Sequence, residues 1–344
     1  MALTPSTVQL ANFRSWFDDT EYNVRQQQKN MMKDPIFELL GEDTSANLSD
    51  TLSTTGVDYT GIARAKTPGG AVTKDAPIEL DQHSVPYITF VKRFSYELET
   101  IAHDKYKFVD PNGTAVIDQL WEAVGLFLTN CMWNDNTSTT TTVLAHEGTI
   151  SYANTTPDGQ AIISASHSGP TYSSKTNIGG TGALSGPNLV ANRQVAKQNF
   201  VFGSSLPKNY KGDTILIPDV EPMIEQALQI TGSEKVASSS NNSISLYQGG
   251  SRDVVVFRYA PRNNAGAYDT TTTDLYKWAT ADRGAMKMGM KYKWILKPQI
   301  VQSSNIDDNN LDSFRTAVCR IAFLPEDPFC LCQNNASTAP TTNW

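Results

Sequence analysis

The sequence has little cysteine, with four in 344 residues. This number is too small for a disulfide framework in a chain of this length. Cys131 falls inside a helical pattern, whereas Cys319, Cys330 and Cys332 lie near the end of the chain. We interpret all four as buried free thiols, because the Cys330-Leu-Cys332 spacing differs from that of the usual zinc hairpins and no second Cys/His pair flanks it.

Long apolar runs are also absent. None approaches the ~20 residues that a membrane-spanning helix requires. The first residues, MALTPSTVQLANF, lack the basic and then apolar layout of a secretory signal. We therefore expect no membrane partner, and a protein that is made and kept in a cytosol.

Charged residues make up only 18% of the chain, and the formal net charge is −7, from 35 acidic and 28 basic residues. A chain of this charge has no overall attraction to phosphate backbones or anionic membranes. This argues against sequence-specific binding of nucleic acid.

The usual signatures of catalysis are missing too. The four histidines are scattered, without the paired spacing that seats a metal. His167 lies close to three serines, but no G-x-S-x-G elbow accompanies it. The glycine-rich stretch at Gly179–Gly182 lacks the Gly-Lys-Ser/Thr of a phosphate loop. We expect a protein that is not an enzyme, with no catalytic residue, cofactor or metal.

What the chain does contain is Thr, Ser, Asn and Gly in place of charge, a composition that favours β-structure and polar loops. The first part is polar and cannot close a core of its own, so we expect an arm at 1–56. A long β-rich stretch follows at 57–98, broken by the turn sequence Lys66–Gly70, and predicts a protruding two-stranded ribbon. The Thr-rich run at Thr139–Thr142 predicts a solvated loop tip.

The remaining pattern alternates helices with non-sequential strands, which indicates an α+β fold. Apolar residues at three-to-four spacing predict a long helix from Asn112 to about Trp133, and a second from Leu184 to Phe200 with Ser185 as its N-cap. Thr214–Ile217 predicts a short buried strand that Pro218 ends, and Asp219 is the expected cap of a third helix that runs to the break at Gly232. Late strands are expected at 253–259, 291–300 and 314–324.

Three pieces of sequence carry a resemblance when taken in order. They are the segment Pro157–Ser164 with His167 behind it, Asn177 followed by the helix start Ala183-Leu184-Ser185, and Thr214–Pro218 followed by Glu221 and a helix. This succession resembles the major head subunits of Mu-like and related tailed bacteriophages, which share the Hong Kong 97-type capsid fold. The chain departs from the Mu-like branch after the second helix, at Phe202–Pro207, and in its tail.

The resemblance implies an α+β, Hong Kong 97-like fold with an arm, an extended β-ribbon loop, a peripheral domain built on a long spine helix, and an axial domain. We place these parts by analogy, in this order: arm 1–56, extended loop 57–98, peripheral domain 99–160 and 301–335, axial domain 161–300, and a C-terminal tail 336–344. The implied function is that of a major capsid protein of the virion. It would assemble in the host cytoplasm into hexamers and pentamers, forming an icosahedral shell around double-stranded DNA without sequence specificity, and its partners would be a portal and scaffolding or decoration proteins.

The extended loop and its surroundings are expected to supply the contacts between subunits. The candidate residues are Lys66, Lys74, Tyr87, Phe90, Lys92, Arg93, Phe94, Glu97 and Glu99. The charged members predict ion pairs across subunits, and the aromatic ones predict apolar burial. In some members of this fold a loop lysine bonds covalently to an asparagine of a neighbour. Lys66 and Lys74 lie in the corresponding region, but loop lysines without this chemistry are common.

Two alternatives remain open. An encapsulin-like compartment shell would share the fold but enclose enzyme cargo. A phage tail-tube subunit would also self-assemble, but would normally be a smaller β-barrel without the long helix at 115–133.

Overall fold

The computed structural model confirms the α+β class, since helices and strands are mixed along the described residues. It describes residues 35–45, 51–54, 57–59, 77–79, 82–97, 109–232, 253–260, 262–263, 266–268, 273–306 and 312–340. Contacts divide the chain into two compact units. The first unit comprises Met1–Glu38, Tyr87–Gly125 and Lys293–Ala322, and the second comprises Leu39–Pro86, Leu126–Tyr292 and Phe323–Trp344. The division into arm, loop, peripheral and axial domains stays a prediction.

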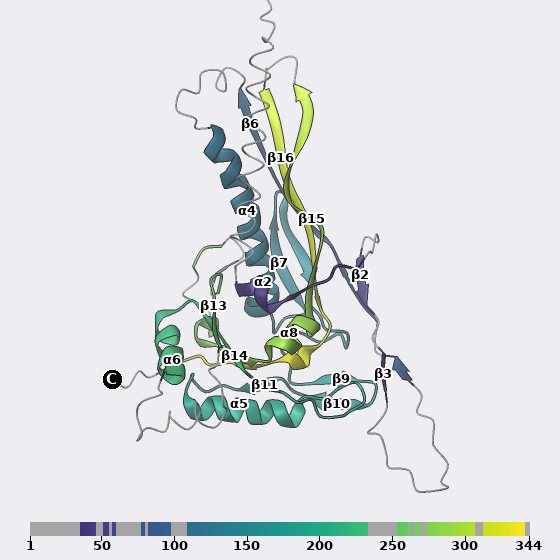
Figure 1. The fold of residues 1–344 in the computed structure, drawn as a ribbon, viewed down its shortest axis with the longest axis vertical. Helices are drawn as coiled ribbons and strands as arrows, with labels where there is room; N and C mark the ends of the chain where they lie inside the picture. Colours follow the sequence, from purple (N-terminus) through teal and green to yellow (C-terminus); the bar gives the residue numbers. More distant parts are fainter. Residues whose placement is uncertain are drawn as a thin grey trace, which may run out of the picture. The chain divides into compact units, whose positions relative to one another are not determined.

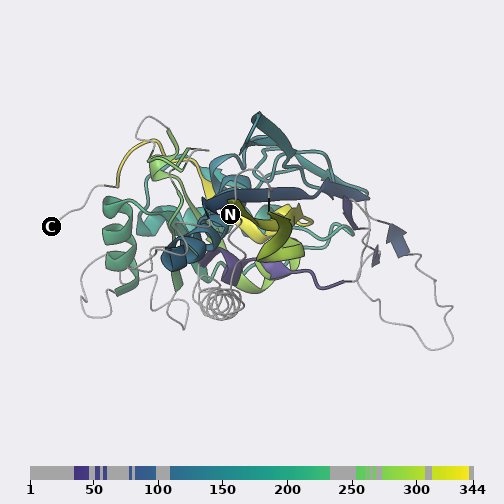
Figure 2. The same ribbon diagram turned by 90° about the horizontal axis from the view of Figure 1, so that it is seen from above.

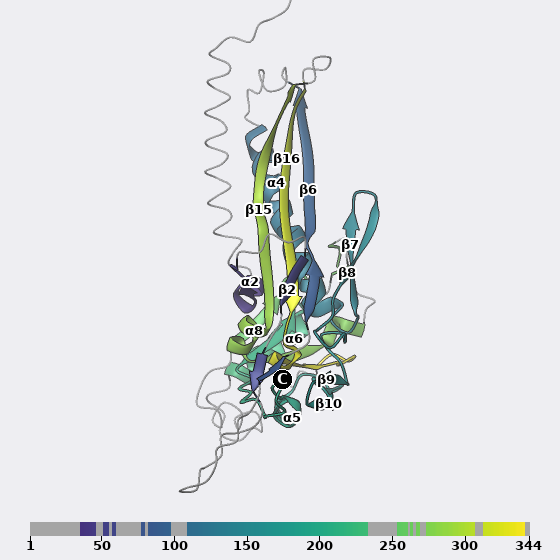
Figure 3. The same cartoon turned by 90° about the vertical axis from the view of Figure 1, so that its right-hand side faces the viewer.

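The first unit is built on three long strands and a helix. Strand β16 (Asp312–Pro325) lies between β15 (Met290–Ile306) and β6 (Ile88–Glu97). It pairs antiparallel with β6 along the full length of β6. Figures 1 and 3 show the three strands running side by side, with helix α4 (Val109–Thr129) alongside.

Helix α4 confirms the predicted long helix and extends into a π-helical turn, η1 (Asn130–Asn134). Its apolar stripe is buried as the three-to-four spacing predicts. In the first unit Trp121 anchors it, with its ring centroid 5.4 Å from that of Trp294 in β15 and 5.6 Å from that of Phe37 in the short helix α2 (Pro35–Leu39).

The second unit contains a five-stranded sheet in the order β11-β17-β14-β12-β13. The strands are β11 (Ile178–Gly180), β17 (Leu331–Asn334), β14 (Trp278–Ala281), β12 (Thr214–Pro218) and β13 (Asp253–Phe257). Every residue of β12 is buried, which confirms the predicted buried strand.

Helices α5 (Gly186–Asn199) and α6 (Glu221–Gly232) pack onto this sheet. Leu189 of α5 and Met223 of α6 belong to one core cluster with Ile215 and Trp278 of the strands. Ser185 caps α5 as predicted, since its side chain accepts a hydrogen bond from the Asn188 N–H. In Figures 1 and 2, α6 stands at one side of the sheet.

The described part of the second unit also contains four two-stranded ladders. They are β2 (Thr51–Thr54) with β5 (His83–Pro86), β3 (Val57–Tyr59) with β4 (Pro77–Glu79), β7 (Thr140–Ala145) with β8 (Gly148–Ala153), and β9 (His167–Gly169) with β10 (Tyr172–Lys175). The shorter elements are β1 (Gly41–Glu42), η2 (Thr273–Tyr276), α8 (Arg283–Gly289) and η3 (Pro328–Cys330).

Two expectations about strands differ from the structure. Within the predicted ribbon, β3 pairs with β4, but β5 pairs with β2, which lies in the predicted arm, and residues 88–97, expected on the returning strand, pair with β16. The loop tip predicted at Thr139–Thr142 is wrong, because β7 begins at Thr140 and Thr141 is buried. β-branched residues that alternate between two faces suit a half-buried strand, and threonine does this as valine does.

The four cysteines are free and buried, as predicted. No helix in the described part of the chain is both long enough and apolar enough to cross a membrane.

Candidate assembly surface

The nine residues expected at subunit contacts fall into three groups. Lys66, Lys74 and Glu99 lie outside the described residues. Phe94 and Glu97 belong to β6, but only their backbone is described. The side chains of Tyr87, Phe90, Lys92 and Arg93 are placed. The inter-subunit roles of all nine stay predictions.

Two of the four placed side chains face the helix of their own unit. Phe90 pairs with Cys319 and Lys92 pairs with Ala317, and both partners are completely buried. The Lys92 ammonium donates a hydrogen bond to the Gln119 side-chain oxygen on α4. The hydrogen bond from Lys92 to Gln119 is therefore a contact within one chain and not a contact between subunits.

The alternate residues of these strands form a second side, which we call the outer sheet face and define by Val91, Ile295 and Val301. Trp294 contacts α4, so its neighbour Ile295 points away from the helix. Val91 is 39% exposed, Ile295 43% and Val301 44%. Apolar side chains are thus open to solvent on the side of the sheet that α4 does not cover.

Polar groups border this face on β6. Arg93 is exposed, and Tyr87 is half-buried with the Arg320 guanidinium 5.6 Å from its ring centroid. An arginine stacked over an aromatic ring is a common arrangement at protein interfaces.

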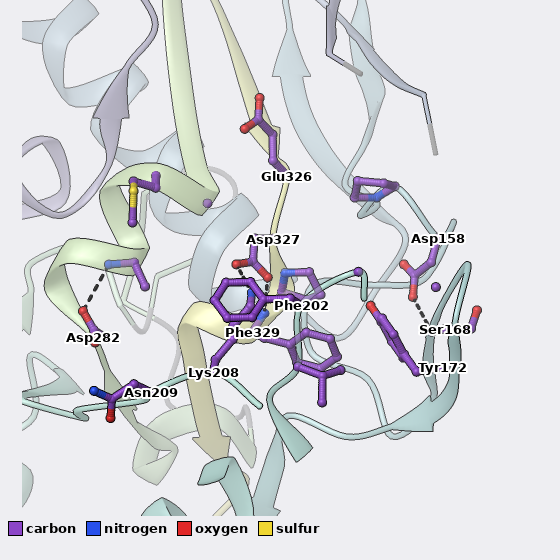
Figure 4. Close-up of a pocket in the computed structure, with 18 of the residues that line it drawn as sticks. Asp158, Ser168, Tyr172, Phe202, Lys208, Asn209, Asp282, Glu326, Asp327 and Phe329 are labelled. Carbon is purple, nitrogen blue, oxygen red and sulfur yellow. Dashed lines mark hydrogen bonds and ion pairs between the residues drawn. The ribbon is translucent and has the colours of Figure 1, made fainter. Parts of the chain in front are cut away.

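The second unit holds a groove of about 690 Å³ that sequence reasoning did not find. Phe202 and Met288 line it and are 47% and 70% exposed. Lys208 forms an ion pair with Asp327, and its ammonium lies 5.4 Å from the Phe202 ring centroid (Figure 4). The exposed aromatic and thioether side chains of this groove suit binding of an apolar group.

Asp158 lies at the edge of the groove and organises the turn that follows it (Figure 4). Its carboxylate is 3.0 Å from Nδ1 of the fully buried His167 and accepts hydrogen bonds from the Ser168 N–H, at 3.0 Å, and from the Thr156 hydroxyl. Burial by itself would raise the pKa of Asp158, but the bonds from His167, Thr156 and Ser168 outweigh it and lower the pKa to about 2. The arrangement fixes a loop conformation.

Asn177 joins the same region to the end of the chain. Its amide donates to the carbonyl oxygens of Ile162, at 2.7 Å, and Pro328, at 3.0 Å, while its side-chain oxygen accepts from the Ser164 N–H at 2.9 Å. Every polar atom of this buried side chain is satisfied, so it specifies one packing of three segments. Asp158, His167 and Asn177, which belong to the segments that carry the sequence resemblance, therefore stabilise the packing of these loops by hydrogen bonds.

Comparisons with known proteins give structural matches only. No family model matches the sequence, and no curated protein matches it. The chain is similar in structure to the capsid of Myoviridae phage XM1, at 11% identity over 86% of this chain and 89% of that one, with a TM-score of 0.48. It is similar to the mature capsid of bacteriophage PhiM1 at 9% identity over 89% of this chain and 87% of that one, with a TM-score of 0.49. It is also similar to the procapsid of satellite phage P4, at 10% identity over 97% of this chain and 92% of that one, with a TM-score of 0.44. These are capsid chains. What each of those shells contains or assembles with is a property of that particle.

Lys277 is a further residue that the sequence analysis missed. It is 1% exposed, and its ammonium donates to the carbonyl oxygens of Trp133 and, at 3.4 Å, Asn134. These carbonyls end the π-helical turn after α4, where a cation is favourable. Its only trace in the sequence is its place between two aromatic residues, Tyr276 and Trp278, directly before a buried strand.

Among the described residues no group of three or more His, Cys, Asp and Glu gathers to hold a metal.

Proposed function

We propose that this protein is the coat subunit of an icosahedral phage shell, assembled from hexamers and pentamers around double-stranded DNA. The observation that carries the proposal is the outer sheet face. Val91, Ile295 and Val301 are open to water on strands whose other side is packed against α4. Removing apolar area from water stabilises by about 25 cal/mol per Å², and neighbouring copies of the chain would supply the cover.

The ladder β3–β4 supports the same proposal. Within the described residues it joins no further strand, and its two members are three residues long. An isolated hairpin of this kind is marginally stable in water. A surface on a neighbouring subunit would give it the packing that a lone hairpin does not have.

The charge of the chain agrees with a DNA container. A net charge of −7 gives no strong attraction to phosphate, so packaged DNA could move during filling and release. The portal, scaffolding and decoration partners expected from the resemblance belong to this proposal, and co-purification with the products of neighbouring genes tests them.

Electron microscopy and sedimentation of the purified protein test the proposal. Icosahedral particles support it, tubes would favour the tail-tube alternative, and shells that recruit a protein cargo rather than DNA would favour the encapsulin-like one. Monomers at every concentration would overturn all three. Val91→Asp should abolish particles because it places a charge on the outer sheet face, whereas Val91→Ile, which keeps that face apolar, should not.

A further inference from the structure

Helix α6 carries an exposed ridge of acidic and apolar residues, which we call the acidic ridge: Glu221, Glu225 and Leu228. These positions are spaced i, i+4 and i+7, so they lie in one row on the helix. They are on the opposite side from the buried Met223 and Ala227. Both glutamates are exposed, and Leu228 is 59% exposed. Helix α6 contains no basic residue.

Helix α5 carries the opposite charge in a matching row, the basic ridge: Val190, Arg193 and Lys197. Val190 is 53% exposed and Lys197 is exposed, while Arg193 lies half-buried at the edge of the row. Helix α5 contains no acidic residue. One arginine amino group donates to the Lys211 carbonyl oxygen at 2.6 Å, which holds the guanidinium in place.

The spacing of the two ridges corresponds when the helices run antiparallel. On α6, Glu225 and Glu221 lie three and seven positions before Leu228. On α5, Arg193 and Lys197 lie three and seven positions after Val190. An antiparallel contact therefore sets Leu228 against Val190, Glu225 against Arg193 and Glu221 against Lys197. It also opposes the two helix dipoles, with the acidic end of one helix next to the basic end of the other.

One copy of the chain does not make this contact itself. Leu189 of α5 and Met223 of α6 face a shared core. The acidic ridge lies on the opposite side of α6 from this core, and the basic ridge follows the border of the buried side of α5, where Val190 and Lys197 are exposed. Glu221, Glu225 and Lys197 form no ion pair among the described residues.

We propose that the acidic ridge of one copy docks antiparallel on the basic ridge of the next copy in the ring. This inference rests on the proposed shell function and names one of its contacts. Because the two ridges are different surfaces, the contact is head-to-tail, and such contacts generate rings when their rotation closes. Each subunit of a pentamer or hexamer would use both of its ridges.

Charge reversal tests the contact in the full-length chain. Glu221→Lys and Lys197→Glu should each raise the protein concentration needed for half-maximal assembly by on the order of tenfold, because like charges then face each other. The double variant Glu221→Lys/Lys197→Glu should return to within about twofold of the wild type, as coupled pairs do. Light scattering and electron microscopy give the readout.

Two controls separate docking from folding. Glu147→Lys reverses an exposed charge in the turn between β7 and β8 and should assemble as the wild type does. Urea unfolding of each unassembled variant shows whether the helix ends are intact. Normal assembly of either single reversal, or a double variant no better than the singles, overturns the ridge contact. A wild-type chain that forms no particles overturns the proposed function instead.

Discussion

Hydrogen bonds from neighbouring groups stabilise the charged form of the Asp158 carboxylate. The free energy of unfolding should therefore depend on pH in the range where this carboxylate titrates. The pKa of Asp158 is lowered from 3.8 to about 2 in the folded chain. A lowered pKa stabilises the fold above the unfolded value, and this contribution is lost as the pH falls from about 4 toward 2. We expect Asp158→Ala to lower the free energy of unfolding by about 1–3 kcal/mol at pH 7, because the partner groups of Asp158 lose their acceptor.

Urea unfolding of the unassembled subunit at several pH values measures this effect. The difference between wild type and Asp158→Ala should shrink as the pH is lowered from 4 to 2. Glu147→Ala, at an exposed turn, should change the free energy of unfolding by no more than about 0.5 kcal/mol at either pH. An unchanged difference between pH 4 and pH 2 would show that the charge of Asp158 does not carry the stabilisation.

Lys277 is expected to stabilise the fold through its buried hydrogen bonds. Its ammonium satisfies two carbonyl oxygens at the end of the turn after α4. Lys277→Met keeps the length and apolar stem of the side chain but removes the donors, so we expect a loss of about 1–3 kcal/mol in the free energy of unfolding. Lys277→Arg keeps a charged donor and should lose less. A Met variant as stable as the wild type would contradict the assignment.

At the scale of elements, Trp121 is a buried aromatic contact of α4 in the first unit. It is 2% exposed and makes edge contacts with Trp294 and Phe37. Trp121→Ala should lower the free energy of unfolding by about 3–5 kcal/mol because it leaves a large cavity, and Trp121→Phe should lower it by less. Denaturant unfolding followed by circular dichroism checks both, and equal losses for Ala and Phe would mean that the indole edge contacts, rather than the filled volume, hold the helix.

Elements with a local signature were predictable from the sequence, but their partners were not. The helices at 109–134, 186–199 and 221–232 follow from apolar spacing and caps, and the cap at Ser185 is confirmed. The pairing of β6 with β16 joins segments more than two hundred residues apart. Nothing in the local sequence of β6 specifies that partner, because alternation fixes which side of a strand is buried and not which strand lies beside it.

The candidate assembly surface was only partly predictable from the sequence, because local patterns do not specify which distant segments pack together. Composition and the ordered segments from Pro157 onward indicated the fold class and the kind of protein. The outer sheet face and the groove appear only once the strands and helices are packed, because each combines residues from distant parts of the chain. Each ridge lies within one helix, but the sequence of that helix does not show that the ridge stays exposed once the helix packs on the sheet. The sequence does not show that Asn177 and Lys277 are buried and hydrogen-bonded, because their partners Pro328 and Trp133 lie far along the chain.

At the scale of the whole molecule, the loop between β2 and β5 should serve assembly rather than folding. Thr54 pairs with His83, so replacing residues 55–82 by Asn-Gly would close β2 and β5 into a tight antiparallel hairpin. This removes β3, β4 and the segment between them but keeps the β2–β5 ladder and its contact with β8. We expect the free energy of unfolding of the subunit to change by less than about 1 kcal/mol while particle formation is lost.

A variant of full loop length, Lys66→Gln/Lys74→Gln, separates the reach of the loop from the chemistry of its lysines. Because an exposed ion pair contributes only about 0–1 kcal/mol, this variant should still form particles, with at most a modest rise in the concentration required. Denaturing electrophoresis of wild-type particles adds the covalent test, since a ladder of multimers that disappears in the Gln variant would assign crosslinking to these lysines. Complete shells from the shortened chain would show that the loop is dispensable, and the contacts that close the shell would then have to come from the outer sheet face and the ridges alone.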